Sequence, residues 1–355
     1  MRVGRDLRLC VVTAASSAAL RRDRAVRETI RAWRELAGGP GARDDERPTL
    51  IACSAGADSS ALAVALSCVR AARLVVAHVV HDMRPRDEAL ADRDAARGLA
   101  SKLDLPFVEA EVATRAVPGN VESAARTLRY RALSRLAREH GCGYVAVAHH
   151  ADDQLETVLM RLLRGAGPRG LSGARPTRAL SRSVTLIRPM LSVSRADAER
   201  ICNAAGWTWQ TDRTNADVSR LRSALRVRVT PVLKELSPTV LRRVTSSAAT
   251  LRDAADLVTR EARRLLDSGV REGDSIRWTR GAVRAEHPAI VAGVLRLGVL
   301  EITRSRGADR LSHAVIRRAT GAAISPDTEP RTFTLGPAQL SLTNSIAAIT
   351  LRGDA

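Results

Sequence analysis

Short apolar runs alternate with longer helical segments over the first half of the chain. The apolar runs, which we expect to be strands, are Leu50–Cys53, Leu74–Val80, Phe107–Val112 and Tyr144–Ala148. The helical segments begin near residue 59, cover residues 88–103, run from 120 to 140, and open again near 152. Continuous apolar strands separated by helices are typical of a parallel sheet that is buried on both faces. The pattern predicts a doubly wound α/β fold, which binds ligands at the carboxyl ends of its strands.

Helical spacing dominates the second half of the chain. Ser237 and Pro238 are expected to begin a long helix, because serine is a preferred N-cap and proline suits the first helical position. Further helices are expected near residues 289–302 and 312–320, and alternating apolar residues predict a small terminal β element within residues 331–351. We expect an extension and lead-in helix over residues 1–46, a first domain over 47–236, and a mainly helical second domain over 237–355.

The charge balance of the chain indicates a class of binding partner. The chain has 57 lysines and arginines against 38 acidic residues, a formal charge of +19. A coding bias toward arginine explains why only two lysines occur, Lys102 and Lys234, but it does not explain the excess of positive over negative charge. We therefore favour a polyanion such as nucleic acid over a merely solvated basic surface. Because aromatic residues are only 2% of the chain, phosphate contacts should outweigh base stacking.

The cysteines and the amino-terminal residues bear on location. No two of the five cysteines form a C-x-x-C pair, so we expect small buried thiols in a reducing compartment. Arg2, Arg5 and Arg8 before Leu9–Ala19 faintly resemble a secretory signal. We favour a start-site extension or a disordered tail, because polar residues interrupt the apolar part. The expected location is the cytoplasm, with no membrane association.

The segment after the first strand contains a candidate phosphate-binding loop. It consists of Ser54, Ala55, Gly56, Ala57, Asp58, Ser59 and Ser60, directly before a helix. Backbone N–H groups at a helix start bind anions, and the serines add hydroxyl donors. Asp58 suits a magnesium ion that bridges phosphate oxygens. The loop lacks the Gly-Lys-Ser/Thr of a Walker A sequence, which disfavours a kinase or GTPase, although an ordinary serine-rich turn has the same composition.

Strand, S-x-G-x-D-S and helix together resemble the PP-loop of N-type ATP-pyrophosphatases. The resemblance implies an ATP site at residues 54–59, magnesium on Asp58, and cleavage of ATP between its α- and β-phosphates. The position of Ala55 is usually glycine in that family. The methyl group restricts the positive φ that glycine adopts freely, so altered loop geometry or reduced activity is one interpretation.

The segment after the fourth strand is the more specific signal. It reads His149-His150-Ala151-Asp152-Asp153-Gln154-Leu155-Glu156-Thr157. On a helix that begins near Asp152, Asp153 shares a face with Glu156, while His150 lies at the strand end. Such acidic residues often merely complement a helix dipole, but here they fall on the expected ligand edge. The continuation through Arg164, Gly165 and Gly167 resembles the R-G-x-G-x-x-G-L segment of tRNA(Ile)-lysidine synthetases.

Three further segments resemble the same family. Residues 120–130, with Arg126 and Arg129, are similar to its N-x-E-x-x-A-R-x-x-R-Y helix. Residues 78–84 are similar to its H-x-x-H-G-L-R strand end, with Asp82 and Met83 in place of Gly-Leu. The D-x-S-N-x-D segment and its trailing arginines correspond to Asp212, Asn215, Asp217, Arg222 and Arg226. Ser223 departs from the family pattern there, which has an asparagine after the first of these arginines.

The resemblance implies that ATP and free L-lysine convert the wobble cytidine of an isoleucine tRNA with a CAU anticodon into lysidine. Asp58, His150, Asp153 and Arg126 are then the expected catalytic residues, and residues 237–355 are expected to contact the tRNA. A tRNA thiolase of the same superfamily is one alternative, although it needs cysteines for sulfur or an iron–sulfur cluster. A catalytically silent tRNA-binding relative is the other. The oligomeric state is open, a homodimer included.

Overall fold

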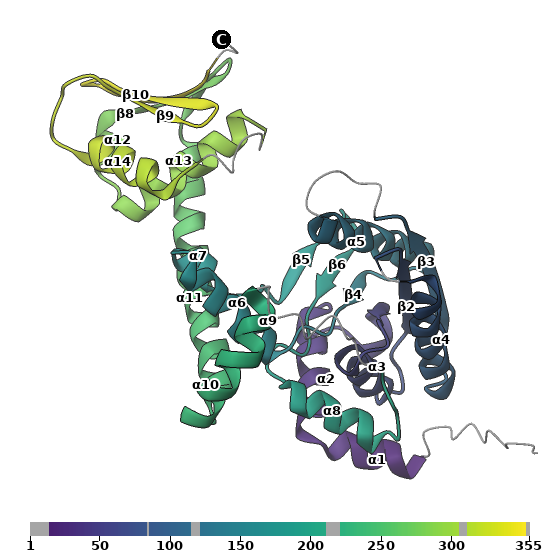
Figure 1. Ribbon diagram of the computed structural model, residues 1–355. Coiled ribbons are helices and arrows are strands. Elements are labelled where there is room, and N and C mark those ends of the chain that lie inside the picture. The colour runs from purple at the N-terminus through teal and green to yellow at the C-terminus, as the bar shows by residue number, and fades with distance from the viewer. Residues whose placement is uncertain (1–13, 84, 115–120, 211–220, 305–310, 353–355) are drawn as a thin grey trace, which may run out of the picture. The chain divides into compact units, whose positions relative to one another are not determined.

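The computed structural model describes residues 14–83, 85–114, 121–210, 221–304 and 311–352, and it divides into two compact units (Figure 1). The first unit ends at Ala249 and the second begins at Thr250. Helix α11 (Val240–Asp267) continues from one unit into the other. The expected functional boundary at Ser237 stays a prediction.

The first unit is built on a six-stranded sheet in the order β3-β2-β1-β4-β6-β5. Its strands are β1 (Thr49–Ala52), β2 (Leu74–His81), β3 (Phe107–Val112), β4 (Tyr144–Ala146), β5 (Thr177–Ala179) and β6 (Thr185–Ile187). All neighbours are parallel except β5, which pairs antiparallel with β6 at the sheet edge. The predicted doubly wound α/β architecture is confirmed.

Helices cover both faces of this sheet. They are α1 (Ala14–Arg22), α2 (Arg24–Leu36), α3 (Ala57–Ser67), α4 (Arg86–Lys102), α5 (Val121–Glu139) and α8 (Arg195–Ala204), with a short 3-10 turn η1 (Asp44–Glu46) before β1. Side chains that alternate along each strand separate the two faces. Ile51 packs in the core formed with α2, α3, α4 and α8, whereas Leu50 packs in the core under α5. The edge formed by the carboxyl ends of the strands, where ligands are expected, is therefore supported by an apolar core on each face of the sheet.

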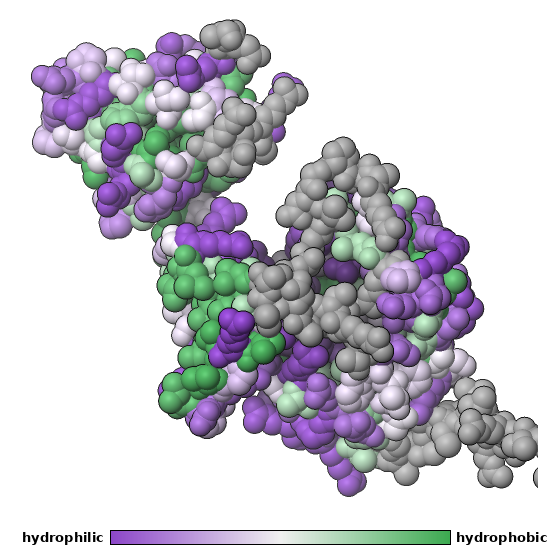
Figure 2. All heavy atoms as spheres, viewed as in Figure 1, coloured by the Kyte–Doolittle hydropathy of each residue, from purple (hydrophilic) through white to green (hydrophobic). Residues whose placement is uncertain are grey.

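A further helical group of the first unit comes partly from between β4 and β5 and partly from after α8. It comprises α6 (Ala151–Leu163), α7 (Pro168–Leu171), α9 (Leu221–Ala224), the π-helical segment η3 (Leu225–Val229) and α10 (Thr230–Leu236). Apolar atoms gather over α6, α9 and α10 in Figure 2. Leu162, Leu163, Val232 and Leu236 on these helices are each at least half exposed. No described helix is both long and apolar enough to cross a membrane.

The second unit packs helices on an antiparallel sheet in the order β7-β8-β11-β10-β9. The strands are β7 (Val270–Glu272), β8 (Ser275–Thr279), β9 (Arg331–Leu335), β10 (Ala338–Leu342) and β11 (Ile346–Leu351), and the helices are α12 (Arg280–Arg284), α13 (Pro288–Ile302) and α14 (His313–Ile324). Trp278 anchors the core, since its indole N–H donates to the Leu265 carbonyl at 2.8 Å. The expected helices and terminal β element are confirmed.

Two details of the second half differ from the sequence predictions. The long helix begins at Val240, and Ser237 instead accepts a turn hydrogen bond from the Val240 N–H. The β element is larger than predicted, because β7 and β8 join it from a distant part of the chain. Strand β7 has three exposed residues, and so short an element carries too little alternation to be recognised in a sequence.

Candidate functional site

The turn after β1 forms a cradle closed by serine side chains. The Ser59 hydroxyl accepts from the Ser54 N–H at 3.1 Å, lies 3.2 Å from the Ser54 hydroxyl, and donates to the Gly56 carbonyl at 3.1 Å. Gly56 is the N-cap of α3 and offers no side chain to its first N–H groups. Those groups point out of the start of an eleven-residue helix, an arrangement that attracts phosphate.

Ala55 adopts the left-handed backbone conformation that the family pattern assigns to glycine. Its φ is +64°, and its side chain is buried. For a residue with a Cβ this conformation costs roughly 1–2 kcal/mol, so the surrounding structure must hold it in place. One such contact is a hydrogen bond from the Gln210 N–H to the Ala55 carbonyl at 3.0 Å. The loop thus keeps a glycine-like shape in spite of the alanine.

Asp58 offers one held and one unsatisfied carboxylate oxygen. Its Oδ2 atom lies 3.3 Å from Nε2 of His150, whereas its Oδ1 atom is buried without a hydrogen-bond partner among the described residues. A buried, unpartnered carboxylate oxygen beside a phosphate cradle fits a magnesium ligand. No group of three or more His, Cys, Asp or Glu side chains in the described part of the chain forms a metal site on its own.

His150 joins the ends of β1 and β4. It is the N-cap of α6 and forms a capping box with Asp153: the His150 N–H donates to Asp153 Oδ2 at 3.1 Å, and the Asp153 N–H donates to Nδ1 at 3.4 Å. Nδ1 therefore accepts, which leaves Nε2 to donate toward Asp58. Burial favours the neutral ring, but the hydrogen bond to Asp58 and the charges of Asp153 and Asp152 outweigh it and raise the pKa of His150.

The acidic face of α6 holds two arginines from the following helical group. Glu156 is 1% exposed and accepts from Arg222 Nε at 2.8 Å and from Arg226 Nε at 2.7 Å. Arg222 also reaches Asp153 Oδ1 at 2.5 Å. Burial opposes ionisation of Asp153, but the charges of His150 and Arg222 prevail and lower its pKa. The structure thus unites the predicted residues Asp58, His150, Asp153, Glu156, Arg222 and Arg226 in one network.

Lys234, which lies in none of the sequence motifs, also enters this region. Its ammonium group pairs with Asp152, and the other Asp152 oxygen accepts from the Arg195 N–H at 2.9 Å. Asp152 therefore links α10, α6 and the start of α8. Its role is to position α6, and only the fold reveals it, because Lys234 follows Asp152 by 82 residues.

Other predicted residues lie elsewhere. Arg164, Gly165 and Gly167 follow the far end of α6, which at 1.5 Å per residue is roughly 20 Å from His150. The predicted residues Asp212, Asn215 and Asp217 lie outside the described part of the chain.

Comparison with known proteins agrees with this geometry. A family model described as the PP-loop domain matches residues 27–233. A relative from Salinispora tropica, named tRNA(Ile)-lysidine synthase, is 38% identical over 268 residues, which are 73% of this chain and 78% of the relative. The chain belongs to the tRNA(Ile)-lysidine synthase family. A second relative with that name, from Bordetella parapertussis, is 38% identical over 227 residues, 61% of this chain and 64% of its own length.

The fold of this family member is shared with a solved structure of different sequence. The U34-tRNA thiolase NcsA from Methanococcus maripaludis matches with a TM-score of 0.50 and 18% identity, over 64% of this chain and 79% of that one. At this identity the likeness supports the fold alone.

A second basic cluster of this lysidine synthase family member lies beside the network. We name it the Tyr130 cluster: it comprises Tyr130, Arg126, Arg129, Arg178 and Arg188. The structure places the predicted residues Arg126 and Arg129 here, at the ring of Tyr130, and not on the α6 carboxylates. Arg178 and Arg188 come from β5 and from the end of β6, two strands that the sequence pattern did not reveal.

His149 connects the Tyr130 cluster to Asp153. Its Nδ1 atom accepts from Arg188 Nε at 3.2 Å. Burial, together with the positive charges of Arg188, Arg126 and Arg222, lowers the pKa of His149 to about 3 against the opposing charge of Asp153. The ring is therefore neutral at physiological pH, and its pKa shift is opposite in direction to that of its neighbour His150. Only the doubled histidine in the sequence hinted at this role.

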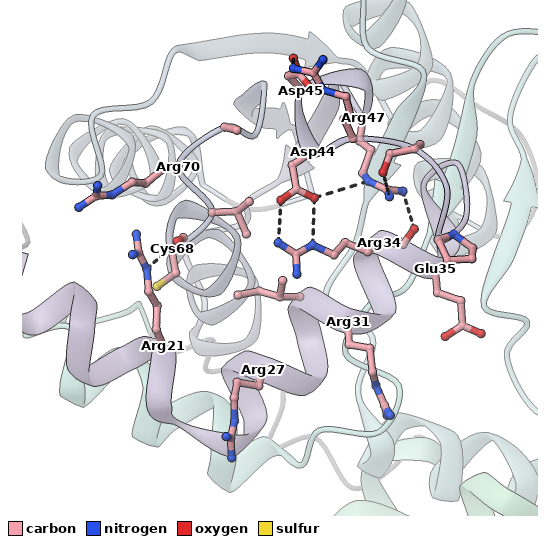
Figure 3. A pocket seen from close by; sticks show the side chains of 16 residues that line it. Arg21, Arg27, Arg31, Arg34, Glu35, Asp44, Asp45, Arg47, Cys68 and Arg70 are labelled. Atoms are coloured by element: carbon pink, nitrogen blue, oxygen red, sulfur yellow. Dashed lines mark hydrogen bonds and ion pairs between the residues drawn. The ribbon is translucent and has the colours of Figure 1, made fainter.

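A wide cavity of the same unit lies away from this chemistry (Figure 3). It has a volume of about 1230 Å³ and is bordered by α2, η1 and the residues after α3, at the opposite edge of the sheet from the carboxyl ends of the strands. Arg34 forms a bidentate pair with Asp44, and buried Arg47 donates to carbonyls at the end of α2 and in the glycine-rich loop after it. These arginines stabilise that loop, and none of the predicted site residues lies there.

Proposed function

We propose that this chain ligates free L-lysine to carbon 2 of the wobble cytidine of an isoleucine tRNA with a CAU anticodon, with ATP as the energy source. The products are lysidine, AMP and pyrophosphate. The observation that carries the proposal is the contact between Asp58 and His150, which brings the phosphate cradle and the acidic face of α6 together in a member of this family.

The first step is adenylation of the base. The carbonyl oxygen at carbon 2 of cytosine attacks the α-phosphorus of ATP, and the bond to the bridging oxygen of pyrophosphate breaks. Residues Ser54–Ser59 would bind the phosphates through serine hydroxyls and the open N–H groups of α3. Asp58 would hold magnesium, which neutralises charge on the phosphates during this step. Arg126, whose charge reaches His149, is the candidate to bind the α-phosphate.

The second step replaces AMP by lysine. The side-chain amine of lysine forms a bond to carbon 2, AMP departs with the former carbonyl oxygen, and the nitrogen loses a proton. We assign proton handling to His150 and Asp153, because Nε2 of His150 lies 3.3 Å from Asp58 and 3.7 Å from Asp153. Arg222 and Arg226 are candidates for the lysine carboxylate, since guanidinium groups bind carboxylates bidentately.

We propose an RNA-binding role for the predicted residues that lie away from the network. Arg164, Gly165 and Gly167 lie in the exposed turn that follows α6. Residues 237–355 are proposed to contact the body of the tRNA through their basic side chains.

The thiolase alternative is disfavoured by the state of the cysteines. Cys53, Cys68, Cys142 and Cys202, the cysteines in the described part of the chain, are buried and form no disulfide there. Burial, with the nearby charge of Asp58, raises the pKa of Cys202 to about 12, and burial also raises the pKa of Cys53 and of Cys142. Sulfur transfer needs thiolates, which such surroundings oppose.

Mass spectrometry of nucleosides tests the proposal directly. Isoleucine tRNA with a CAU anticodon is incubated with the protein, ATP, magnesium and lysine, and its nucleosides are then analysed. We expect lysidine to form only when all components are present. Pyrophosphate exchange into ATP that depends on tRNA but yields no lysidine would mean that another nucleophile is used. An absence of both would indicate the silent RNA-binding relative.

A further inference from the structure

The Tyr130 cluster gathers four guanidinium groups that have no acidic partner among the described side chains. The guanidinium carbons of Arg126, Arg178 and Arg129 lie 5.2, 5.6 and 5.9 Å from the centre of the Tyr130 ring. Arg188 hydrogen-bonds to the tyrosine and donates to the Arg175 carbonyl at 2.6 Å. Among the described residues, none of the four arginines forms an ion pair with a carboxylate.

Such a concentration of positive charge is unfavourable without a counter-ion. Burial lowers the pKa of Arg129 and of Arg188 below the ordinary value, and the neighbouring arginines lower both further. Arg188 is only 6% exposed, so water cannot fully screen it. Arg126 and Arg178 are exposed, which leaves the cluster open to an anion from solvent. Such an anion would relieve the repulsion.

The topology separates this cluster from the phosphate cradle. The cradle follows β1, whereas Arg178 lies on β5, with β4 and β6 between them. Three strand spacings of about 4.8 Å place β5 roughly 14 Å from β1. Arg178 also belongs to an edge strand whose three residues are all exposed. An anion bound at the outer part of the cluster would therefore lie apart from phosphates in the cradle.

The chemistry of the substrates narrows the choice of anion. Free lysine carries two ammonium groups that four uncompensated arginines would repel, so it fits the neighbouring Asp153 and Glu156 better. The phosphodiester backbone of RNA is the remaining anionic group, and arginine forks match phosphate geometry. Because His149 links Arg188 to the network of Asp153, a strand bound here would pass directly beside the reaction centre.

We propose that the Tyr130 cluster binds a phosphodiester group of the RNA strand that carries the target base, with Arg178 as its outermost contact and Arg129 and Arg188 behind it. This inference rests on the proposed function, because it takes the substrate to be RNA. It adds a binding site on β5 and β6 that positions the strand and does not itself take part in the chemistry.

The test is direct binding of an unmodified transcript of isoleucine tRNA to the full chain, without ATP or lysine, across a series of salt concentrations. Arg178→Gln should weaken binding about fivefold to tenfold and lower the slope of log K against log salt by about 0.7–0.9. Arg178→Lys should keep the slope, because it keeps the charge. Arg138→Gln is the matched control, since it removes one exposed arginine from α5 and should change affinity less than twofold.

ATP binding, measured separately, should be unchanged by Arg178→Gln. If ATP affinity falls while RNA affinity stays, Arg178 belongs to the nucleotide site, as proposed for Arg126, and the inference is wrong. Equal RNA affinity and slope for Arg178→Gln and Arg138→Gln would make Arg178 ordinary solvated surface and also overturn it. A chain that forms no lysidine, yet loses RNA affinity with Arg178→Gln, would refute the proposed function and leave this inference standing.

Discussion

Nε2 of His150 lies 3.3 Å from Oδ2 of Asp58, although the two residues belong to different strand ends. Strands β1 and β4 are neighbours in the sheet, so their carboxyl ends meet at the point where the strand order reverses. The contact leaves the second oxygen of Asp58 without a hydrogen-bond partner among the described residues and available to a ligand. The phosphate cradle and the acidic helix therefore form one site.

Asp58→Asn should abolish adenylation and leave tRNA affinity nearly unchanged. A neutral amide is a poor magnesium ligand, and the substitution would also remove a charge that raises the pKa of His150. Asp94→Asn, an exposed position on α4, is the control and should be fully active. The measurement is formation of adenylated RNA from labelled ATP. A rate above a tenth of the parent rate for Asp58→Asn would show that Asp58 does not hold the metal.

Ala55→Gly should keep or raise activity and change the free energy of unfolding by less than about 1 kcal/mol. Relief of the left-handed conformation, about 1–2 kcal/mol, is offset by the lost buried methyl, about 0.8 kcal/mol, and by added backbone freedom. Ala61→Gly within α3 lacks this relief and should lose about 1–2 kcal/mol. Denaturant titration compares the two. Equal losses would mean that the conformation of Ala55 is not strained.

Glu156→Gln should destabilise the protein by about 2 kcal/mol and weaken lysine use. The buried carboxylate holds Arg222 and Arg226, which are themselves 38% and 26% exposed, so the cost falls below that of a fully buried pair. Glu199→Gln, in an exposed pair with Arg195, should cost less than about 0.5 kcal/mol. Unfolding midpoints and the KM for lysine are the measurements. A loss no greater than that of Glu199→Gln would contradict the role of Glu156 as an anchor.

The two adjacent histidines should have opposite effects on stability as pH changes. The pKa of His149 is lowered to about 3 in the folded protein. The unfolded chain therefore binds a proton at this residue near pH 6.5, whereas the folded protein does not. The contribution of His149 to the free energy of unfolding is fully present above pH 6.5 and should fall by about 2 kcal/mol as the pH drops to 4.5. The pKa of His150 is raised, so its contribution is present below 6.5 and is lost as pH rises through the folded value. Urea titrations from acid to alkaline pH measure both.

His149→Gln should flatten the acid side of the stability profile, and His150→Gln should flatten the alkaline side. Each variant serves as the control for the other. If His149→Gln follows the parent protein between pH 6.5 and 4.5, the ring is not held neutral by its surroundings.

The arginines of α11 should divide into two groups in RNA binding. Arg263 and Arg264 pair with glutamate side chains of the second unit, whereas Arg242, Arg243 and Arg260 are exposed and have no ion pair among the described residues. Replacing the latter three by Gln should lower the salt slope of tRNA binding by about 2–3, with little effect on ATP binding. Replacing the paired two should lower it less. Equal slopes for parent and triple variant would mean that this helix is structural.

The sequence by itself determined the parallel core and the chemistry on its ligand edge. Buried parallel strands must be largely apolar, so Leu74–His81 is recognisable from composition alone. The edge strand Phe107–Val112 is recognisable from the apolar residues that alternate with its exposed Glu109 and Glu111. The residues that come directly after β1 and β4 are adjacent to those strands in the sequence. The loop of residues 54–59 and the pair His150 and Asp153 could therefore be assigned to the ligand edge. Helix starts and strand ends depend on neighbouring residues, which a sequence shows directly.

Only the tertiary structure decided which distant groups meet. Glu156 receives Arg226 from 70 positions away, and Asp152 receives Lys234 from 82, because α9, η3 and α10 pack on α6. Strands β5 and β6 have three residues each, too few to show a period of alternating side chains. The positions of Arg178 and Arg188 could therefore not be predicted from the sequence. The partition of arginines between the α6 carboxylates and Tyr130 depends on packing and charge across the fold, which no local pattern contains.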